Sequence, residues 1–165
     1  MDARNELISW LRDAYAMERG LETTLKKFSQ NDKYPEEFRA ACRKHLLETQ
    51  QQSQTVESLL KSLGADKSTV KTGIGLLMET IKGAGAVAAR DQVVKEMITT
   101  YASEQFEIAC YEAIVAAAEV AGQPLVAEAC RQMISDEKNM AQTIYDLLPG
   151  AVHFYLGEQQ LPKAA

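Results

Sequence analysis

The chain has 165 residues, of which 46% are hydrophobic and 25% charged, and its formal net charge is −5. This length suits a single domain with a core deep enough to enclose a site. The acidic balance argues against a nucleic-acid partner, because a phosphate backbone repels a negative surface that lacks a basic patch. The short basic pairs Lys26-Lys27 and Arg43-Lys44 are interpreted as solvated helix faces.

Several sequence features bear on the compartment. No apolar run reaches the roughly 18 residues that a membrane-spanning helix needs, so we expect no membrane partner. Residues 1–12 lack the basic and then apolar pattern of a signal peptide. Cys42, Cys110 and Cys130 are scattered, odd in number and form no CxxC pair, which fits reduced thiols. We therefore expect a cytoplasmic protein.

Two long helices are predicted in the first part of the chain. The segment from about Ala3 to Ser29 has no proline and carries apolar residues at helical spacing. A loop follows and ends at Pro35, a residue that suits the first turn of a helix. The second helix should run from about Glu36 to Leu63, because Gly64 is a typical helix terminator.

The segment from Asp66 to Asp91 differs from its surroundings because it is rich in glycine. Only Ile74 to Ile81 has the pattern of a short helix. A phosphate-binding loop is disfavoured, since no Gly-Lys-Ser/Thr follows and no strand precedes. We interpret the segment as a long crossover that contains a short extra helix, the connection by which ferritin-like bundles join their second and third helices.

Two further helices complete the predicted bundle. The third should run from about Asp91 to Ala121 and end at Gly122. The fourth should begin at Gln123-Pro124 and continue to Leu148, where Pro149-Gly150 should stop it. The sequence therefore predicts an all-α, ferritin-like four-helix bundle over residues 1–150.

The C-terminal residues 151–165 are predicted to form a separate tail. They include apolar side chains that are too numerous for a free end: Val152, Phe154, Tyr155 and Leu156. We expect this tail to pack on the bundle or on a second subunit.

Each predicted helix carries a glutamate where its apolar stripe would otherwise place a leucine. In an antiparallel bundle these mid-length positions lie at about the same height, so the side chains should meet. On the second helix, His45 and Gln52 also lie on the stripe. The inward glutamates are Glu18, Glu48, Glu104 and Glu137, and Glu107 lies one turn after Glu104.

Ionised carboxylates in a core need compensation, because each unpaired buried charge is strongly destabilising. Two cations within a shell of glutamates would provide it, as in di-metal bundles. Oxygen ligands with an occasional histidine suit iron or manganese better than zinc. Protonated carboxyls that hydrogen-bond one another are an alternative. Buried lysine or arginine partners are less suitable, because the nearest basic residues lie off the stripes: Arg19, Lys44, Arg131 and Lys138.

Four stretches carry a family resemblance by their order and spacing. They are LRDAYAME at 11–18, HLLET at 45–49, EQFEIACY at 104–111 and DEK at 136–138. Together they resemble the YciE/YciF family of bacterial ferritin-like stress proteins over about residues 5–148. This resemblance implies a ferritin-like bundle, often dimeric, with a di-metal centre and no firmly assigned reaction. The metal ligands that it implies are Glu18, Glu48, Glu104, Glu107 and Glu137.

The sequence departs from the wider ferritin-like pattern at two positions. The Glu-x-x-His signature would place histidines where this chain has Gln51 and Met140. Gln52 is a candidate substitute ligand, although amides bind hard cations more weakly than carboxylates. The pair Glu104-x-x-Glu107 adds an oxygen ligand at the same spacing. His45 could ligate a metal or brace a ligand, or it could be a core or boundary histidine whose hydrogen bonds are satisfied within the fold.

Two functions are compatible with these residues. The first is an oxidoreductase-like protein with two Fe or Mn ions bridged by Glu48, Glu104 or Glu107, and Glu137, with Glu18 as a terminal ligand. It would act on oxygen, peroxide or a small substrate in oxidative stress. The second is a non-enzymatic stress-response bundle that keeps a relic or structural acidic core and acts through its surface or as a homodimer. The missing histidines favour the second function and the retained glutamates favour the first.

Overall fold

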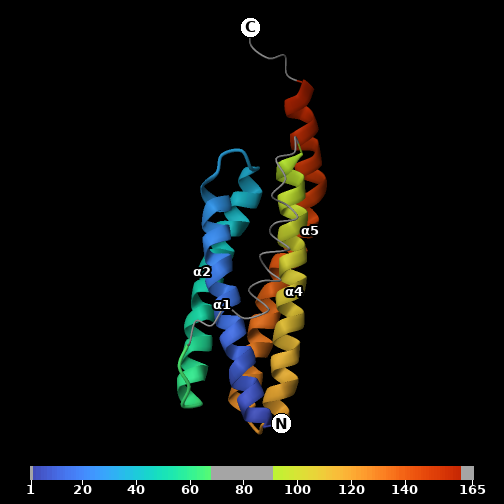
Figure 1. The fold of residues 1–165 in the computed structure, drawn as a ribbon. Helices are drawn as coiled ribbons and strands as arrows, with labels where there is room; N and C mark the ends of the chain where they lie inside the picture. Colours follow the sequence, from blue (N-terminus) through green and yellow to red (C-terminus); the bar gives the residue numbers. More distant parts are fainter. Residues whose placement is uncertain (1, 68–90, 161–165) are drawn as a thin grey trace.

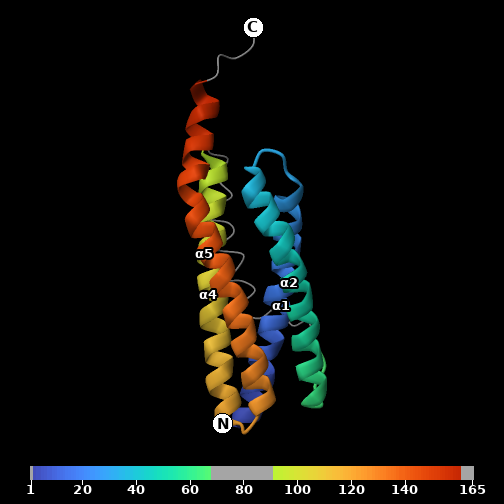
Figure 2. The ribbon, with the colours of Figure 1, turned by 180° about the vertical axis from the view of Figure 1, so that it is seen from behind.

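The computed structural model describes residues 2–67 and 91–160, and within them the chain forms four α-helices. These are α1 (Ala3–Gln30), α2 (Glu36–Ser62), α4 (Gln92–Val120) and α5 (Pro124–Gln160). α1 lies beside α2 and α4 beside α5, and the two pairs form one elongated bundle (Figures 1 and 2). The prediction of an all-α, ferritin-like four-helix bundle is confirmed. The predicted crossover helix at 74–81 lies outside the described residues.

The helix ends follow local signals in the sequence. Asp2 precedes α1, and its carboxylate accepts a hydrogen bond of 3.1 Å from the Arg4 backbone N–H. Gly64 and Gly122, which follow α2 and α4, have φ values of 69° and 65°. This left-handed conformation strains any residue with a Cβ, which explains why both helices end next to a glycine. None of the described helices is long and apolar enough to cross a membrane.

The predicted end of the fourth helix at Leu148 is wrong. α5 continues through Pro149 to Gln160, so residues 151–160 extend the helix. Proline inside a helix removes one backbone hydrogen bond and costs about 3 kcal/mol. Ala151 on the following turn is 1% exposed and packs in one apolar cluster with Phe38 and Met97, a contact that favours the continued helix.

The core consists of two apolar clusters with a polar layer between them. One cluster includes Leu11, Val56 and Cys130, and the other includes Phe28, Phe38 and Ile144. On α2, α4 and α5 the residues of the two clusters are separated by buried polar side chains at mid-length, and on α1 the buried Glu18 lies between Met17 and Leu21 of the first cluster. The apolar clusters therefore shield the polar layer from solvent at both ends. The buried residues of this layer are Glu18, His45, Thr49, Gln52, Ser53, Glu104, Glu107 and Glu137.

Candidate metal centre

Four carboxylates and one imidazole meet in the polar layer, and all four described helices contribute. Each of the five side chains is at most 2% exposed. The helices place them at the same height because each residue lies near the middle of its helix. The residues are Glu18 from α1, His45 from α2, Glu104 and Glu107 from α4, and Glu137 from α5.

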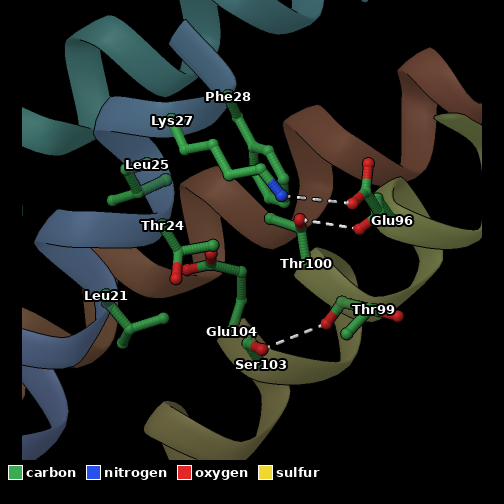
Figure 3. A pocket seen from close by; sticks show the side chains of 10 residues that line it. All are labelled: Leu21, Thr24, Leu25, Lys27, Phe28, Glu96, Thr99, Thr100, Ser103 and Glu104. Carbon is green, nitrogen blue, oxygen red and sulfur yellow. Dashed lines mark hydrogen bonds and ion pairs between the residues drawn. The ribbon is translucent and has the colours of Figure 1, made fainter. Parts of the chain in front are cut away.

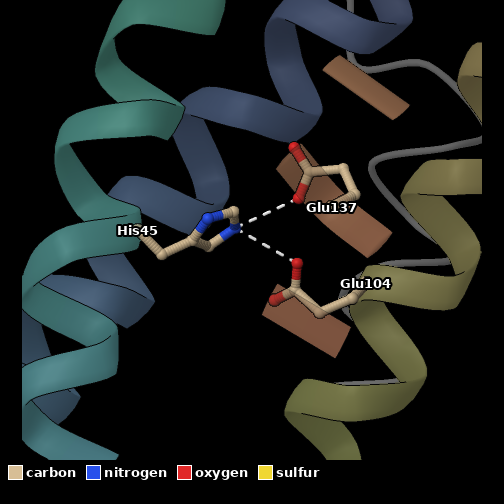
Figure 4. Close-up of side chains that lie close together, drawn as sticks. All are labelled: His45, Glu104 and Glu137. Carbon is tan, nitrogen blue, oxygen red and sulfur yellow. Dashed lines mark ion pairs between the residues drawn. The ribbon is translucent and has the colours of Figure 1, made fainter. Parts of the chain in front are cut away.

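His45 lies between two carboxylates. Its Nε2 atom is 3.1 Å from Oε2 of Glu104 and 3.1 Å from Oε2 of Glu137 (Figure 4). One N–H cannot point at two oxygens, and neither Oε2 atom receives a well-directed hydrogen bond. One ligand atom from each of the three residues lies within 4.8 Å of the others. This spacing allows one cation to contact all three.

A second group of ligand atoms lies beside the first. One carboxylate oxygen from each of Glu18, Glu107 and Glu137 is within 4.8 Å of the other two. Glu137 belongs to both groups, and a carboxylate has two oxygens with which to bridge two ions. The arrangement therefore suits a pair of cations that share one ligand.

Several buried oxygens in this layer have no hydrogen-bond partner among the described residues. Leaving such an atom unpaired costs about 1–3 kcal/mol, and more for a charged group. No lysine or arginine in the described ranges pairs with the four buried carboxylates. Two divalent cations would satisfy these oxygens, and carboxylates with one imidazole suit manganese or iron. The unpaired atoms are Oε2 of Glu18, Glu104 and Glu137, Oε1 of Gln52, Oγ1 of Thr49, and both oxygens of Glu107.

The titration of these groups reflects their burial and their mutual repulsion. Burial, reinforced by the charge of Glu137, raises the pKa values of Glu18 and Glu107 well above their usual range. Burial also raises the pKa of Glu104 to about 7, although the charge of His45 opposes the shift. Burial alone would lower the pKa of His45, but the charge and hydrogen bonding of Glu104 and its neighbours raise it. Without metal, the layer therefore holds protons.

Two further residues orient the carboxylates. The Tyr111 hydroxyl donates a short hydrogen bond to Oε1 of Glu18, and this tyrosine is fully buried. The Gln52 amide donates to Oε1 of Glu137 at 2.7 Å. In each glutamate the second carboxylate oxygen, Oε2, has no hydrogen-bond partner, and the bond at Oε1 fixes the direction in which Oε2 points. Gln52, predicted as a substitute ligand, thus contacts the centre through Glu137.

Glu48 does not join either group, contrary to the expectation that it points inward with the other glutamates. Its side chain is 29% exposed, 2.8 Å from Lys44 Nζ and 3.0 Å from His45 Nδ1. The hydrogen bond with His45, followed by that with Lys44, lowers the pKa of Glu48 to about 2. His45 and Gln52 occupy the buried stripe of α2, and this turns Glu48 toward the edge. The candidate ligand from α2 is therefore His45, braced by Glu48.

Neither position at which the wider ferritin-like pattern would have a histidine contributes a side chain to the centre. Gln51, where the wider ferritin-like pattern would have a histidine, is exposed and faces away from the centre. Met140 is buried in the second apolar cluster. The imidazole instead comes from His45, two turns earlier on α2. Its position on the buried stripe was visible in the sequence, but its role as ligand or brace was not.

The buried carboxyls predict that the metal-free protein loses stability as the pH rises. The folded-state pKa values of Glu18, Glu104 and Glu107 lie above the ordinary glutamate value of 4.5. Their contribution to the free energy of unfolding is fully present below pH 4.5 and is lost as the pH rises through the folded-state pKa values. His45 acts in the same direction above pH 6.5. Glu48 acts oppositely, but its contribution is complete above its ordinary value of 4.5.

The measurement is the free energy of unfolding from urea titrations of metal-free protein. We expect a lower value at about pH 8 than at about pH 5, because the folded carboxyls must then lose protons in an apolar setting. Saturating metal should reduce the difference, since a cation replaces those protons. A stability that rises between these two pH values would contradict the assignment.

The fold and this centre define a class, that of ferritin-like bundles with a buried carboxylate cluster. Residues 2–157 match the family described as Domain of unknown function (DUF892), and the chain belongs to this family. The resemblance to the YciE/YciF family noted in the sequence is thereby confirmed.

Three solved structures are similar to this chain. A protein from Xanthomonas campestris pv. campestris is 32% identical, with a TM-score of 0.79 over 96% of this chain and 99% of that chain. The E. coli stress protein YciF is 22% identical, with a TM-score of 0.73 and coverages of 92% and 97%. YcfI from Rhodopseudomonas palustris is 24% identical, with a TM-score of 0.73 and coverages of 88% and 94%. The last two likenesses concern the fold alone.

Proposed function

We propose that this protein binds two iron or manganese ions in its core and serves an oxidative function under stress. The observation that carries the proposal is Glu137, a fully buried carboxylate that belongs to both groups of potential ligands. The buried oxygens around it support the same interpretation, because they have no hydrogen-bond partner and no lysine or arginine among the described residues pairs with them. The similarity to a stress protein of E. coli motivates the physiological part of the proposal.

The ligands divide between the two ions. His45, Glu104 and Glu137 would hold one ion, and Glu18, Glu107 and Glu137 the other. Bound iron or manganese would supply electron transfer with oxygen, peroxide or a small substrate. Glu48 engages Nδ1 of His45, so that Nε2 faces the centre. The two apolar clusters exclude bulk water above and below.

Elemental analysis of protein purified without chelator tests the proposal. Two equivalents of iron or manganese per chain are expected, and thermal unfolding should occur at a higher temperature with metal than without it. Metal well below one equivalent, not restored by anaerobic Fe(II) or Mn(II), would refute the di-metal assignment. The glutamates would then be a protonated polar core.

An apolar surface on α4 and α5 supports a second proposal, that the protein acts as a homodimer. Tyr145, Val152 and Leu156 are 57%, 37% and 49% exposed, and their spacing of seven and four residues places them on one face of α5. Tyr101 of α4 packs against Tyr145 with ring centroids 5.8 Å apart, and Ile98 lies one turn from Tyr101. Apolar residues at this spacing are typical of helices that pair, and a second copy would present the same stripe.

Tyr145→Glu tests this surface. A charge at the centre of the stripe should convert a dimer to a monomer, because an unpaired carboxylate would be buried at the interface. Light scattering coupled to size-exclusion chromatography gives the mass. Glu128→Gln, at an exposed position on α5 outside the stripe, is the control and should leave the mass unchanged. A wild-type chain that is monomeric at every concentration would refute the dimer.

A further inference from the structure

A pocket of about 230 Å³ lies between α1 and α4 and reaches the metal centre at one end (Figure 3). Glu104, a candidate ligand of the first ion, forms part of its wall. Lys27, at the other end, is 63% exposed, so the pocket also approaches the surface. The remaining lining residues in the described part of the chain are Leu21, Thr24, Leu25, Phe28, Glu96, Thr99, Thr100 and Ser103.

The wall offers hydrogen-bond acceptors next to apolar surface. Four hydroxyl groups line the pocket, and each already donates its hydrogen to a backbone carbonyl one turn earlier; that of Thr99 donates to Lys95 at 2.9 Å. Thr24 donates to Gly20 at 3.4 Å, Thr100 to Glu96 at 2.8 Å and Ser103 to Thr99 at 3.1 Å. A hydroxyl has one hydrogen but two lone pairs, so these oxygens are left as acceptors. Leucine and phenylalanine side chains of α1 form the apolar part of the wall (Figure 3).

The charges near the outer end compensate one another. Glu96 is only 8% exposed, and its Oε1 lies 3.7 Å from Lys27 Nζ and accepts a 3.1 Å hydrogen bond from Gln92. Its Oε2 accepts a hydrogen bond from the hydroxyl of Tyr34. This carboxylate therefore needs no cation from a ligand. A charged molecule would gain no free partner there, and its desolvation would oppose entry.

We propose that this pocket binds a small neutral molecule with an apolar body and an O–H donor, such as a phenol or short alcohol, beside Glu104. The size is adequate, since a cavity of about 150 Å³ in another protein holds benzene. The hydroxyl of the ligand donates to an oxygen of Thr24, Thr100 or Ser103, and the apolar body packs against α1. This molecule is the substrate class of the di-metal centre, a step that rests on the proposed function.

The probe is phenol, titrated into metal-free protein by calorimetry and followed by NMR at the leucine methyl groups. Toluene has nearly the same size but no donor, so we expect it to bind about threefold to tenfold more weakly. Thr100→Val removes one acceptor and keeps the shape of the side chain. It should weaken the binding of phenol by up to a similar factor and leave the affinity for toluene unchanged. Thr143→Val is the matched control, because Thr143 makes the same hydroxyl-to-carbonyl bond on an exposed part of α5. It should change neither affinity.

Blocking the pocket provides a separate test. Thr24→Phe should abolish phenol binding, and Ser103→Leu serves the same purpose if the first variant does not fold, which circular dichroism reports. No saturable phenol binding at about 10 mM, where a Kd of ~1 mM gives nine-tenths occupancy, would overturn the proposal. So would binding that survives in a folded blocked variant. If the protein binds phenol but takes up no metal on reconstitution, only the di-metal proposal is refuted. If it takes up two equivalents of metal but does not bind phenol, only the pocket proposal is refuted.

Discussion

Glu137→Gln is expected to cost the protein both metal ions together. Glu137 is the one residue that the two groups of potential ligands share, and it is fully buried. Glutamine has the same size but is neutral, and it binds hard cations weakly. Loss of a residue that only supports a ligand typically lowers metal affinity about 10–100-fold, so loss of this shared ligand should lower it at least that much at each site. Metal per chain after reconstitution measures the effect.

Glu48→Gln is the matched control for this experiment. It removes the same charge from a carboxylate that touches His45 but lies at the edge of the centre, 29% exposed. We expect this variant to retain two ions with weakened affinity for the ion that His45 holds. If Glu137→Gln kept one ion at full affinity, Glu137 would not be a shared ligand. If Glu48→Gln lost both ions, Glu48 would do more than brace His45, and its assignment to the edge of the centre would be wrong.

The bundle was predictable because its signals are local. Proline and glycine mark the helix ends near Pro35, Gly64 and Gly122, and apolar spacing identifies the buried faces. The inward positions of Glu18, Glu104 and Glu137 follow from the same spacing, since a polar residue on an otherwise apolar stripe must be buried with it. These features require no knowledge of how the helices pack.

The assignment of the ligand on α2 needed finer information than a stripe contains. His45 and Glu48 are three residues apart, which is about 60° around a helix of 3.6 residues per turn. Both positions can lie on a broad buried face, and only the packing of α2 against its neighbours decides which side chain points inward. The structure selects His45, and the sequence had left its role open.

Features that depend on distant contacts were also beyond the sequence. The hydrogen bond from Tyr111 to Glu18 joins residues 93 positions apart. The continuation of α5 past Pro149 runs against the local preference of proline and places Ala151 in an apolar cluster with Phe38 of α2, a contact that the local sequence does not reveal. The pocket beside Glu104 likewise exists only because α1 and α4 pack with a gap between them.

Glu107→Met is expected to stabilise the metal-free protein while removing one metal ion. Glu107 is 1% exposed, neither of its carboxylate oxygens has a partner among the described residues, and burial raises its pKa. Methionine fills a similar volume without an unpaired polar group, so the free energy of unfolding should rise by about 1–3 kcal/mol at about pH 8. The gain should shrink at about pH 5, where the carboxyl is protonated in the folded state and more of it is protonated in the unfolded state.

Glu112→Met, on the exposed side of the same helix, is the control for Glu107→Met. Glu112 is 57% exposed and its nearest cation, Lys138, is 3.8 Å away, so its replacement should change stability by no more than about 0.5 kcal/mol. Urea titrations with and without metal distinguish the outcomes. A site selected for metal binding keeps a residue that destabilises the empty protein, so the order of stability should reverse when metal is added. If Glu107→Met were less stable than the parent without metal, the carboxyl would be serving the fold, and the case for a metal ligand at this position would fail.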